Sequence, residues 1–187
     1  MFACGAWLPK LFPRLLGTRI HPTRQEVLFF APPGGDQRFS PQRLPIWLDF
    51  TDPRGPYGFP ELEGRGFKLA FDRHGPPFDP DTGDRHLTAE SVIEARAFLK
   101  ERFPSLWNAP LTESRVCQYE NTSNGDFLID RHPEFENVWL VGGGSGHGFK
   151  HGPAVGEYVA GRVLTCIAAE PRFALATKSE TQKRTVY

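Results

Sequence analysis

The chain has 187 residues, with 22 Lys and Arg against 22 Asp and Glu, so its formal net charge is zero. This balance gives no electrostatic basis for binding nucleic acid or an anionic membrane surface, and no apolar run approaches the roughly 20 residues of a membrane span. Three widely spaced cysteines, Cys4, Cys117 and Cys166, indicate neither a disulfide framework nor a zinc site, and the start lacks signal-peptide regions, so we expect a soluble cytoplasmic protein.

The predicted elements are short strands and two helices. Residues 2–7 resemble the end of a buried strand running into a helix. Strands are expected over 25–30, 46–50, 66–71, 115–120, 126–130 and 137–142, and helices over 88–102 and 153–168.

Alternation and capping signals support these elements. In 66–71, Phe67, Leu69 and Phe71 share one face, and Lys68 and Ala70 share the other. The first helix has Thr88 as a candidate N-cap and ends before Pro104, and the second has Pro153 in its first turn and Val155, Val159, Val163 and Ile167 at four-residue spacing.

The apolar run Val138–Val141 leads into the glycine-rich segment GGGSGHGFK and then into the last helix. A strand, a glycine loop and a helix N-terminus in this order favour the binding of an electron-rich group. The spacing fails the dinucleotide fingerprint in every register, because His147 or Phe149 stands where the third glycine is needed. A serine hydrolase using Ser145 and a glycine turn within a non-catalytic interaction domain both remain open.

An ordered series of motifs resembles one enzyme family. CQYENT from Cys117, DFLIDRHP from Asp126, GSGHGFK from Gly144, and upstream YGFP from Tyr57 and GFK from Gly66 are similar to the C-terminal half of the sarcosine oxidase and N-methyltryptophan oxidase family. The resemblance implies an FAD-dependent oxidoreductase of the DAO type, which oxidises the C–N bond of a secondary or primary amino acid. Oxygen would be the acceptor, and the products would be an imine and hydrogen peroxide.

The resemblance also implies site residues. Cys117 matches the cysteine that carries covalent flavin in some members, and Lys68 matches a catalytic lysine that assists reaction with oxygen. His147 matches a catalytic and substrate-binding residue, and Lys150 one that binds substrate and cofactor. The loop residues expected at the cofactor are Gly143, Gly144, Ser145, Gly146 and Gly148. No metal site is expected, since His147 and His151 lack a carboxylate partner.

The predicted fold is α+β, with a mainly antiparallel substrate-domain sheet and helices, followed by the strand, glycine loop and helix of a Rossmann-like FAD domain. We expect residues 1–14 to end an FAD-domain segment, 15–110 to form the substrate domain, 111–169 to continue the FAD domain and 170–187 to form a flexible tail. No G-x-G-x-x-G follows a strand, so we expect a truncated chain that is inactive alone, or one that works with a separate nucleotide-binding chain. The substrate stays open among sarcosine, N-methyl-tryptophan, pipecolate and glycated amino acids.

Overall fold

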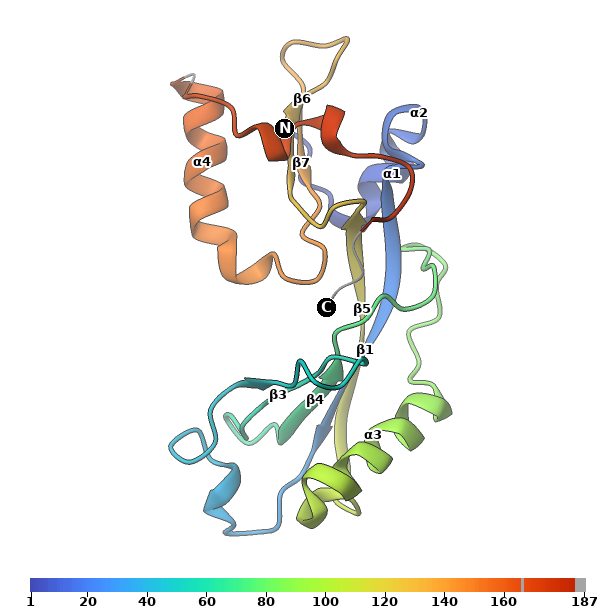
Figure 1. Ribbon diagram of the computed structural model, residues 1–187, viewed down its shortest axis with the longest axis vertical. Helices are drawn as coiled ribbons and strands as arrows, with labels where there is room; N and C mark the ends of the chain where they lie inside the picture. The colour runs from blue at the N-terminus through green and yellow to red at the C-terminus, as the bar shows by residue number, and fades with distance from the viewer. Residues whose placement is uncertain (166, 184–187) are drawn as a thin grey trace. The chain divides into compact units, whose positions relative to one another are not determined.

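The computed structural model describes residues 1–165 and 167–183 (Figure 1). It contains seven strands, four α-helices and short 3-10 turns among these residues. The strands are β1 (Ile20–Phe30), β2 (Trp47–Leu48), β3 (Pro56–Phe59), β4 (Phe67–Phe71), β5 (Leu111–Thr122), β6 (Leu128–Arg131) and β7 (Trp139–Gly142). The helices are α1 (Leu8–Leu11), α2 (Pro13–Leu16), α3 (Ala89–Arg102) and α4 (Gly152–Leu164).

The chain divides into two compact units. Among the described residues, the first contains 1–23, 76–82, 118–165 and 167–183, and the second contains 24–75 and 83–117. The chain passes from one unit to the other after residues 23 and 117, and residues 76–82 return briefly to the first unit. The domain boundaries expected from the sequence stay a prediction.

The second unit is built on an antiparallel arrangement of short strands, as predicted. The sheet has the order β2-β3-β4-β1-β5, and β4 pairs antiparallel with both β1 and β3. Strand β3 was not expected from the sequence, and the predicted strand 46–50 shrinks to the two residues of β2. Gly58 explains β3: a Cβ there would lie 2.5 Å from the Trp47 ring, so glycine lets this ring pack onto the strand.

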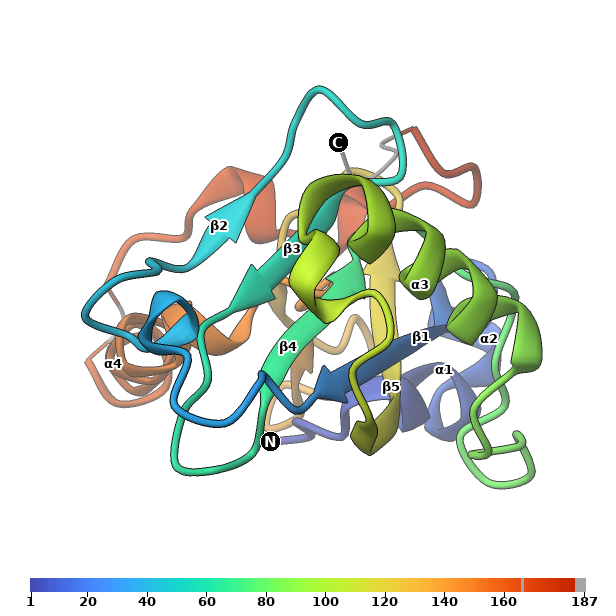
Figure 2. The same ribbon diagram turned by 90° about the horizontal axis from the view of Figure 1, so that it is seen from below.

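Helix α3 covers one face of this sheet (Figure 2). Its predicted N-cap is confirmed, because Thr88 Oγ1 accepts a hydrogen bond from Ser91 N at 3.3 Å. The predicted alternation in β4 is also confirmed. Phe67, Leu69 and Phe71 join the α3-side core, which contains the buried residues Leu28, Phe30, Phe39, Phe67, Leu69, Phe71, Ala95, Phe98, Leu99, Leu106 and Ala109.

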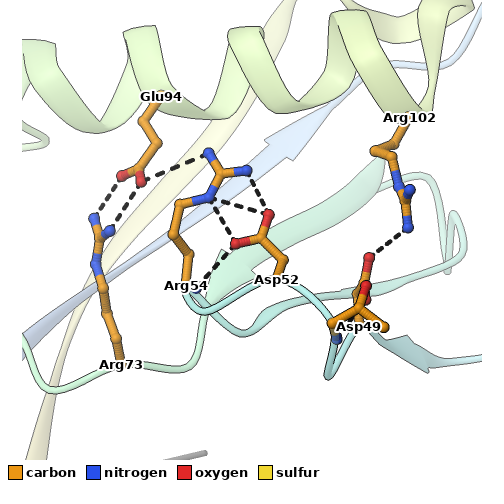
Figure 3. Close-up of polar contacts among 7 residues, drawn as sticks. Asp49, Asp52, Arg54, Arg73, Glu94 and Arg102 are labelled. Carbon is orange, nitrogen blue, oxygen red and sulfur yellow. Dashed lines mark hydrogen bonds and ion pairs between the residues drawn. The ribbon is translucent and has the colours of Figure 1, made fainter.

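Ion pairs tie the 49–54 loop and the end of β4 to α3 (Figure 3). Arg73 Nη1 donates to Glu94 Oε1 at 2.8 Å, and Arg54 Nε donates to Asp52 at 2.9 Å. Arg54 also lies over the rings of Phe71 and Phe98, at 5.4 and 5.7 Å from their centroids. The loop is thus held by charge and by ring packing at the same place. The linked residues are Asp52, Arg54, Glu94 and Arg73, and Arg102 of α3 pairs separately with Asp49.

The first unit is organised around the antiparallel pair β6–β7. Phe2 forms a parallel bridge with Leu140 of β7, and a 3-10 turn (Gly5–Trp7) then leads into α1. The expected run from an extended segment into a helix is found, but the buried strand end is only a single bridge at Phe2, which is 38% exposed. The core of this unit consists of Leu8, Leu16, Ile20, Leu128 and Leu140.

Helix α4 is shorter than expected, because it ends at Leu164 rather than near residue 168; residue 166 lies outside the described residues. Of the apolar residues predicted to share its face, Val159 is buried, whereas Val163 is 40% exposed. Within the described part of the chain, no helix is long and apolar enough to cross a membrane.

The segment after α4 contains two 3-10 turns, Pro171–Phe173 and Leu175–Thr177. Lys178 follows them and is 2% exposed, with its Nζ donating to Arg172 O at 2.7 Å and to Asn124 Oδ1 at 3.2 Å. Ser179 N donates to Ser123 Oγ at 2.9 Å. These contacts attach the segment to the β5–β6 turn, and whether it is flexible in solution, as the sequence predicts, stays a prediction.

Candidate functional site

Lys68 and Cys117 lie in the second unit, on the sheet face opposite α3. Lys68 stands beside Ala70 on β4, and its backbone is in register with Phe29 of β1 and Phe59 of β3. On this face Val27, Phe29 and Ala70 form a small buried cluster, against which Cys117 of β5 packs. The sheet therefore brings together two predicted site residues that are 49 positions apart in the sequence.

A cavity of about 360 Å³ opens over this cluster. This volume is within the lower range of small-ligand sites. Its lining is aromatic and aliphatic apart from three cations and the cysteine, and consists of Val27, Phe29, Phe59, Leu62, Arg65, Gly66, Lys68, Arg115 and Cys117. Both predicted residues thus line one hollow.

The ammonium group of Lys68 is held against aromatic rings. Its Nζ lies 4.4 Å from the Phe59 ring centroid and 5.2 Å from that of Tyr57. In the described part of the chain it makes no ion pair and no hydrogen bond. Burial lowers its pKa, and the positive charges of Arg65 and Arg115 act in the same direction, while Cys117 opposes them. A partly buried ammonium without a polar partner is a position for an electron-rich ligand.

Two arginines at the cavity share one carboxylate, and sequence reasoning missed them. Arg65 Nη2 donates to Glu113 Oε1 at 2.9 Å, and Arg115 Nε donates to the same oxygen at 2.5 Å. Arg65 also lies over the Phe29 ring at 4.6 Å. The sequence did contain a signal for Arg115: it is two residues from Cys117 on the same strand, so the two side chains share a face.

In the first unit, the glycine loop is a tight turn between β7 and α4. Gly143 and Gly146 have positive φ values of 74° and 79°, and Ser145 has φ 45°. A Cβ on Gly143 would lie 2.6 Å from Thr122 Cγ2, and one on Gly146 would lie 2.3 Å from the Tyr119 ring. Glycine is therefore required here by both backbone conformation and close packing.

A carboxyl group that sequence reasoning missed lies under this loop. Glu120 Oε1 accepts a hydrogen bond from Gly144 N at 3.3 Å, and its buried Oε2 has no partner among the described residues. Burial raises the pKa of Glu120, and the amides of Gly144 and Gly143 act in the opposite direction. The glycine loop was expected to bind an electron-rich group through its backbone amides, and part of that role is filled by the carboxyl group of Glu120. No periodicity in the sequence signalled it.

Ser145 is placed unfavourably for a nucleophile. It is 3% exposed, and its Oγ donates to Gly143 O and accepts from Thr122 N, both at 3.2 Å. A hydrolase serine needs an accessible Oγ with a base in hydrogen-bond reach. These contacts instead give the hydroxyl a role in closing the turn.

The remaining predicted residues, His147, Gly148 and Lys150, lie between the loop and α4. His147 Nε2 is 3.0 Å from Gly125 O, and its ring contacts Phe127. Lys150 is exposed and makes no ion pair in the described part of the chain. The N-cap residue of α4, His151, makes no side-chain capping bond, so the exposed first turn of α4 can stabilise an anion. No group of three or more His, Cys, Asp or Glu that could hold a metal ion occurs among the described residues.

Comparison with known proteins identifies the class. A family model described as FAD dependent oxidoreductase matches residues 1–162, so the chain belongs to this family. It is similar to the monomeric sarcosine oxidase of Bacillus sp. (strain B-0618), with 38% identity over 86% of this chain and 42% of the relative. It is also similar to the N-methyl-L-tryptophan oxidase of Salmonella heidelberg (strain SL476), with 30% identity over the same shares. The predicted resemblance is confirmed, and the chain spans about 42% of the length of these relatives.

Solved structures support the fold. The L-proline dehydrogenase of P. horikoshii matches with a TM-score of 0.74 at 22% identity, over 92% of this chain and 45% of that one. The fructosyl peptide oxidase of E. terrenum matches with a TM-score of 0.73 at 18% identity, over 92% and 43%. The predicted α+β fold is therefore confirmed.

Proposed function

We propose that the chain provides the substrate-side part of an FAD-dependent amino-acid oxidase that oxidises a C–N bond with oxygen. Overall, an amine and oxygen would give an imine and hydrogen peroxide. The observation that carries this proposal is the common cavity of Lys68 and Cys117. Family membership and the similarity to sarcosine and N-methyltryptophan oxidases support it.

The residues present fit a flavin. Cys117 is partly buried but lines the cavity, so its thiol is reachable, and four aromatic and aliphatic side chains line the same cavity. FAD, when bound, supplies the two-electron redox chemistry. We propose Cys117 as a covalent attachment point through Sγ. Formation of a thioether at Cys117 would release two electrons and two protons, which oxygen would take up as hydrogen peroxide.

Lys68 is proposed to assist the reaction of oxygen. Its ammonium is fixed by the Phe59 and Tyr57 rings, which leaves its hydrogen-bond donors available. A positioned cation in a partly dehydrated site stabilises negative charge that develops on oxygen. The lysine therefore contributes through its charge.

The glycine loop and α4 are proposed to contribute the cofactor- and substrate-binding groups of the first unit. We assign the substrate carboxylate to Lys150 and His147, next to the uncapped N-terminus of α4. Gly143, Gly144, Ser145, Gly146 and Gly148 are proposed to shape the cofactor loop. Their tight contacts support a role in fixing its backbone.

A chimera tests the function. The N-terminal part of the Bacillus sarcosine oxidase would be fused before residue 1, and peroxide formation would be measured with sarcosine and larger N-methyl amino acids. We expect amine-dependent peroxide and a flavin that remains on the protein in a denaturing gel. Cys117→Ala should lose this flavin band, and Cys4→Ala should keep it. A folded chimera that binds no flavin would contradict the proposal and favour an interaction domain.

Lys68→Met separates the two half-reactions. Reduction of the flavin by substrate should change little, whereas reoxidation by oxygen should slow by at least about tenfold, which corresponds to the loss of about 1.4 kcal/mol of transition-state stabilisation. Stopped-flow absorbance measures each step. Equal effects on both steps would refute the role assigned to Lys68.

A further inference from the structure

The cavity of the second unit has an excess of positive charge. Arg65, Lys68 and Arg115 line it, and no Asp or Glu does. Glu113 is the carboxylate that pairs with the two arginines. Three cations against one carboxylate leave two positive charges around a hollow with apolar walls, in which water screens charge less than in bulk.

The two arginines use Glu113 differently. Arg65 engages it with both Nε and Nη2, at 3.2 and 2.9 Å, which occupies one edge of its guanidinium. Arg115 donates from Nε alone. Its two Nη groups have no hydrogen-bond partner among the described residues, and its side chain is 61% exposed. Glu113 thus holds Arg115 in place and leaves the outer donors of the guanidinium available.

Lys68 provides a second set of unused donors in the same cavity. Its Nζ contacts only ring faces among the described residues. A guanidinium edge and an ammonium group lining one hollow are complementary to an oxyanion with two acceptor atoms. The neighbouring Phe29, Phe59 and Leu62 provide an apolar surface for the rest of such a molecule.

We propose that this cavity is a binding site for a small organic carboxylate, held by the Nη groups of Arg115 and by Nζ of Lys68. The proposed site is formed by residues of this chain alone, and its formation does not require the flavin. In the proposed oxidase, a flavin attached at Cys117 would occupy the same cavity, so the carboxylate and the flavin would exclude each other.

Cys117 allows a direct test, because it lines the same cavity. Its thiolate attacks the disulfide bond of an aromatic disulfide reagent, forms a mixed disulfide and expels one aryl thiolate. Two reagents differ in charge: 5,5′-dithiobis(2-nitrobenzoate) carries two carboxylates, and 4,4′-dithiodipyridine is neutral. Peptide mass spectrometry follows labelling at Cys117, with Cys4 as an internal reference.

We expect Arg115→Gln to lower the rate with the anionic reagent by about fivefold relative to the neutral one, since one unit charge a few ångströms away has an effect of this size in water. Added salt should reduce the difference. Arg43→Gln is the matched control, because Arg43 is exposed, makes no ion pair among the described residues and does not line this cavity.

Protection by a ligand completes the test. Benzoate should slow labelling of Cys117 by the neutral reagent in the parent chain but not in Arg115→Gln, and benzamide, which has the same shape without charge, should not protect. Equal effects of Arg115→Gln and Arg43→Gln, equal protection by benzoate and benzamide, or a Cys117 that reacts with neither reagent would each overturn the proposal. Benzoate protection in a chain whose chimera fails to bind flavin would leave this site standing and refute the oxidase assignment alone.

Discussion

Replacing Glu120 with glutamine should stabilise the first unit at neutral and alkaline pH. The carboxyl group is crowded: a Cβ on Gly142 would lie 2.8 Å from Glu120 Oε2 and 2.4 Å from Leu8 Cδ1. The hydrogen bond that Oε1 accepts from Gly144 N is long at 3.3 Å, and Oε2 has no partner among the described residues. Glutamine keeps the shape and the acceptor of the protonated acid and cannot ionise.

The pH dependence follows from the raised pKa of Glu120. Below its unfolded value, near 4.5, the group is protonated in both states and contributes no pH-dependent term. As the pH rises above 4.5, the unfolded chain ionises first, and the folded state loses stability until the pH passes the folded pKa. Each unit by which burial raises the pKa costs about 1.4 kcal/mol, and a buried, poorly paired polar group typically costs about 1–3 kcal/mol. Glu120→Gln should therefore be more stable than the parent by about 1–3 kcal/mol at pH 8 and nearly equal to it at pH 4.

Urea unfolding at pH 4, 6 and 8, followed by far-ultraviolet circular dichroism, measures this difference. Glu136→Gln is the control, because Glu136 is exposed in the same unit and makes no ion pair in the described part of the chain. The quantity of interest is the change in the gap between parent and variant from pH 4 to pH 8. A gap that stays constant, or one that matches the control, would refute the argument from burial.

Three further substitutions test other parts of the structure. Gly146→Ala should destabilise by at least about 1–2 kcal/mol, because a left-handed φ is costly for alanine and its Cβ would meet Tyr119; thermal unfolding measures the loss. Thr88→Ala should cost about 1 kcal/mol through loss of the α3 cap to Ser91, measured by urea unfolding. Burial lowers the pKa of Lys178 to about 8, against the opposing charge of a nearby aspartate. The charged form is therefore disfavoured in the folded state, and the parent should gain stability relative to Lys178→Met as the pH rises from 8 to 10, in melting temperatures taken across this range.

Matched variants make these outcomes specific. A Cβ on Gly156 in α4 meets nothing within 4 Å, so Gly156→Ala should not destabilise, and equal losses at Gly146 and Gly156 would contradict the strain argument. Thr88→Ser should keep the cap, and a Thr88→Ala variant as stable as the parent would show that the cap contributes nothing. A gap between Lys178→Met and the parent that does not change with pH would contradict the titration.

Sequence patterns over a few neighbouring residues were enough to predict the strands and helices in which buried and exposed side chains alternate regularly. The alternation around Lys68 and the cap at Thr88 depend on neighbouring residues, and both are found as expected. Strand β3 was missed because Gly58 is a poor strand residue by itself; its place follows from the Trp47 ring, which is 11 positions earlier in the sequence.

The site shows the same division. Family motifs pointed to Lys68 and Cys117, and β-strand geometry then brings them to one cavity. Glu120 and the free edge of Arg115 were not predicted, because burial of a carboxyl group and the sharing of Glu113 are properties of tertiary packing. Charged residues on a strand are usually exposed to solvent, and nothing in the sequence indicated that Glu120 has another role.

Each unit carries one sheltered indole, which has a spectroscopic consequence. In the second unit, Trp47 stacks on the α3-side core at 5.8 Å from the Phe98 ring centroid, and its Nε1 is buried without a partner among the described residues. In the first unit, Trp139 is 5% exposed beneath two guanidinium groups. Trp7 and Trp107 are 38% and 46% exposed and emit largely as solvated indoles. In a variant with Trp7 and Trp107 replaced by phenylalanine, only Trp47 and Trp139 emit. Replacing one of these two in turn leaves a single indole, whose emission would record the unfolding of its own unit within the whole chain.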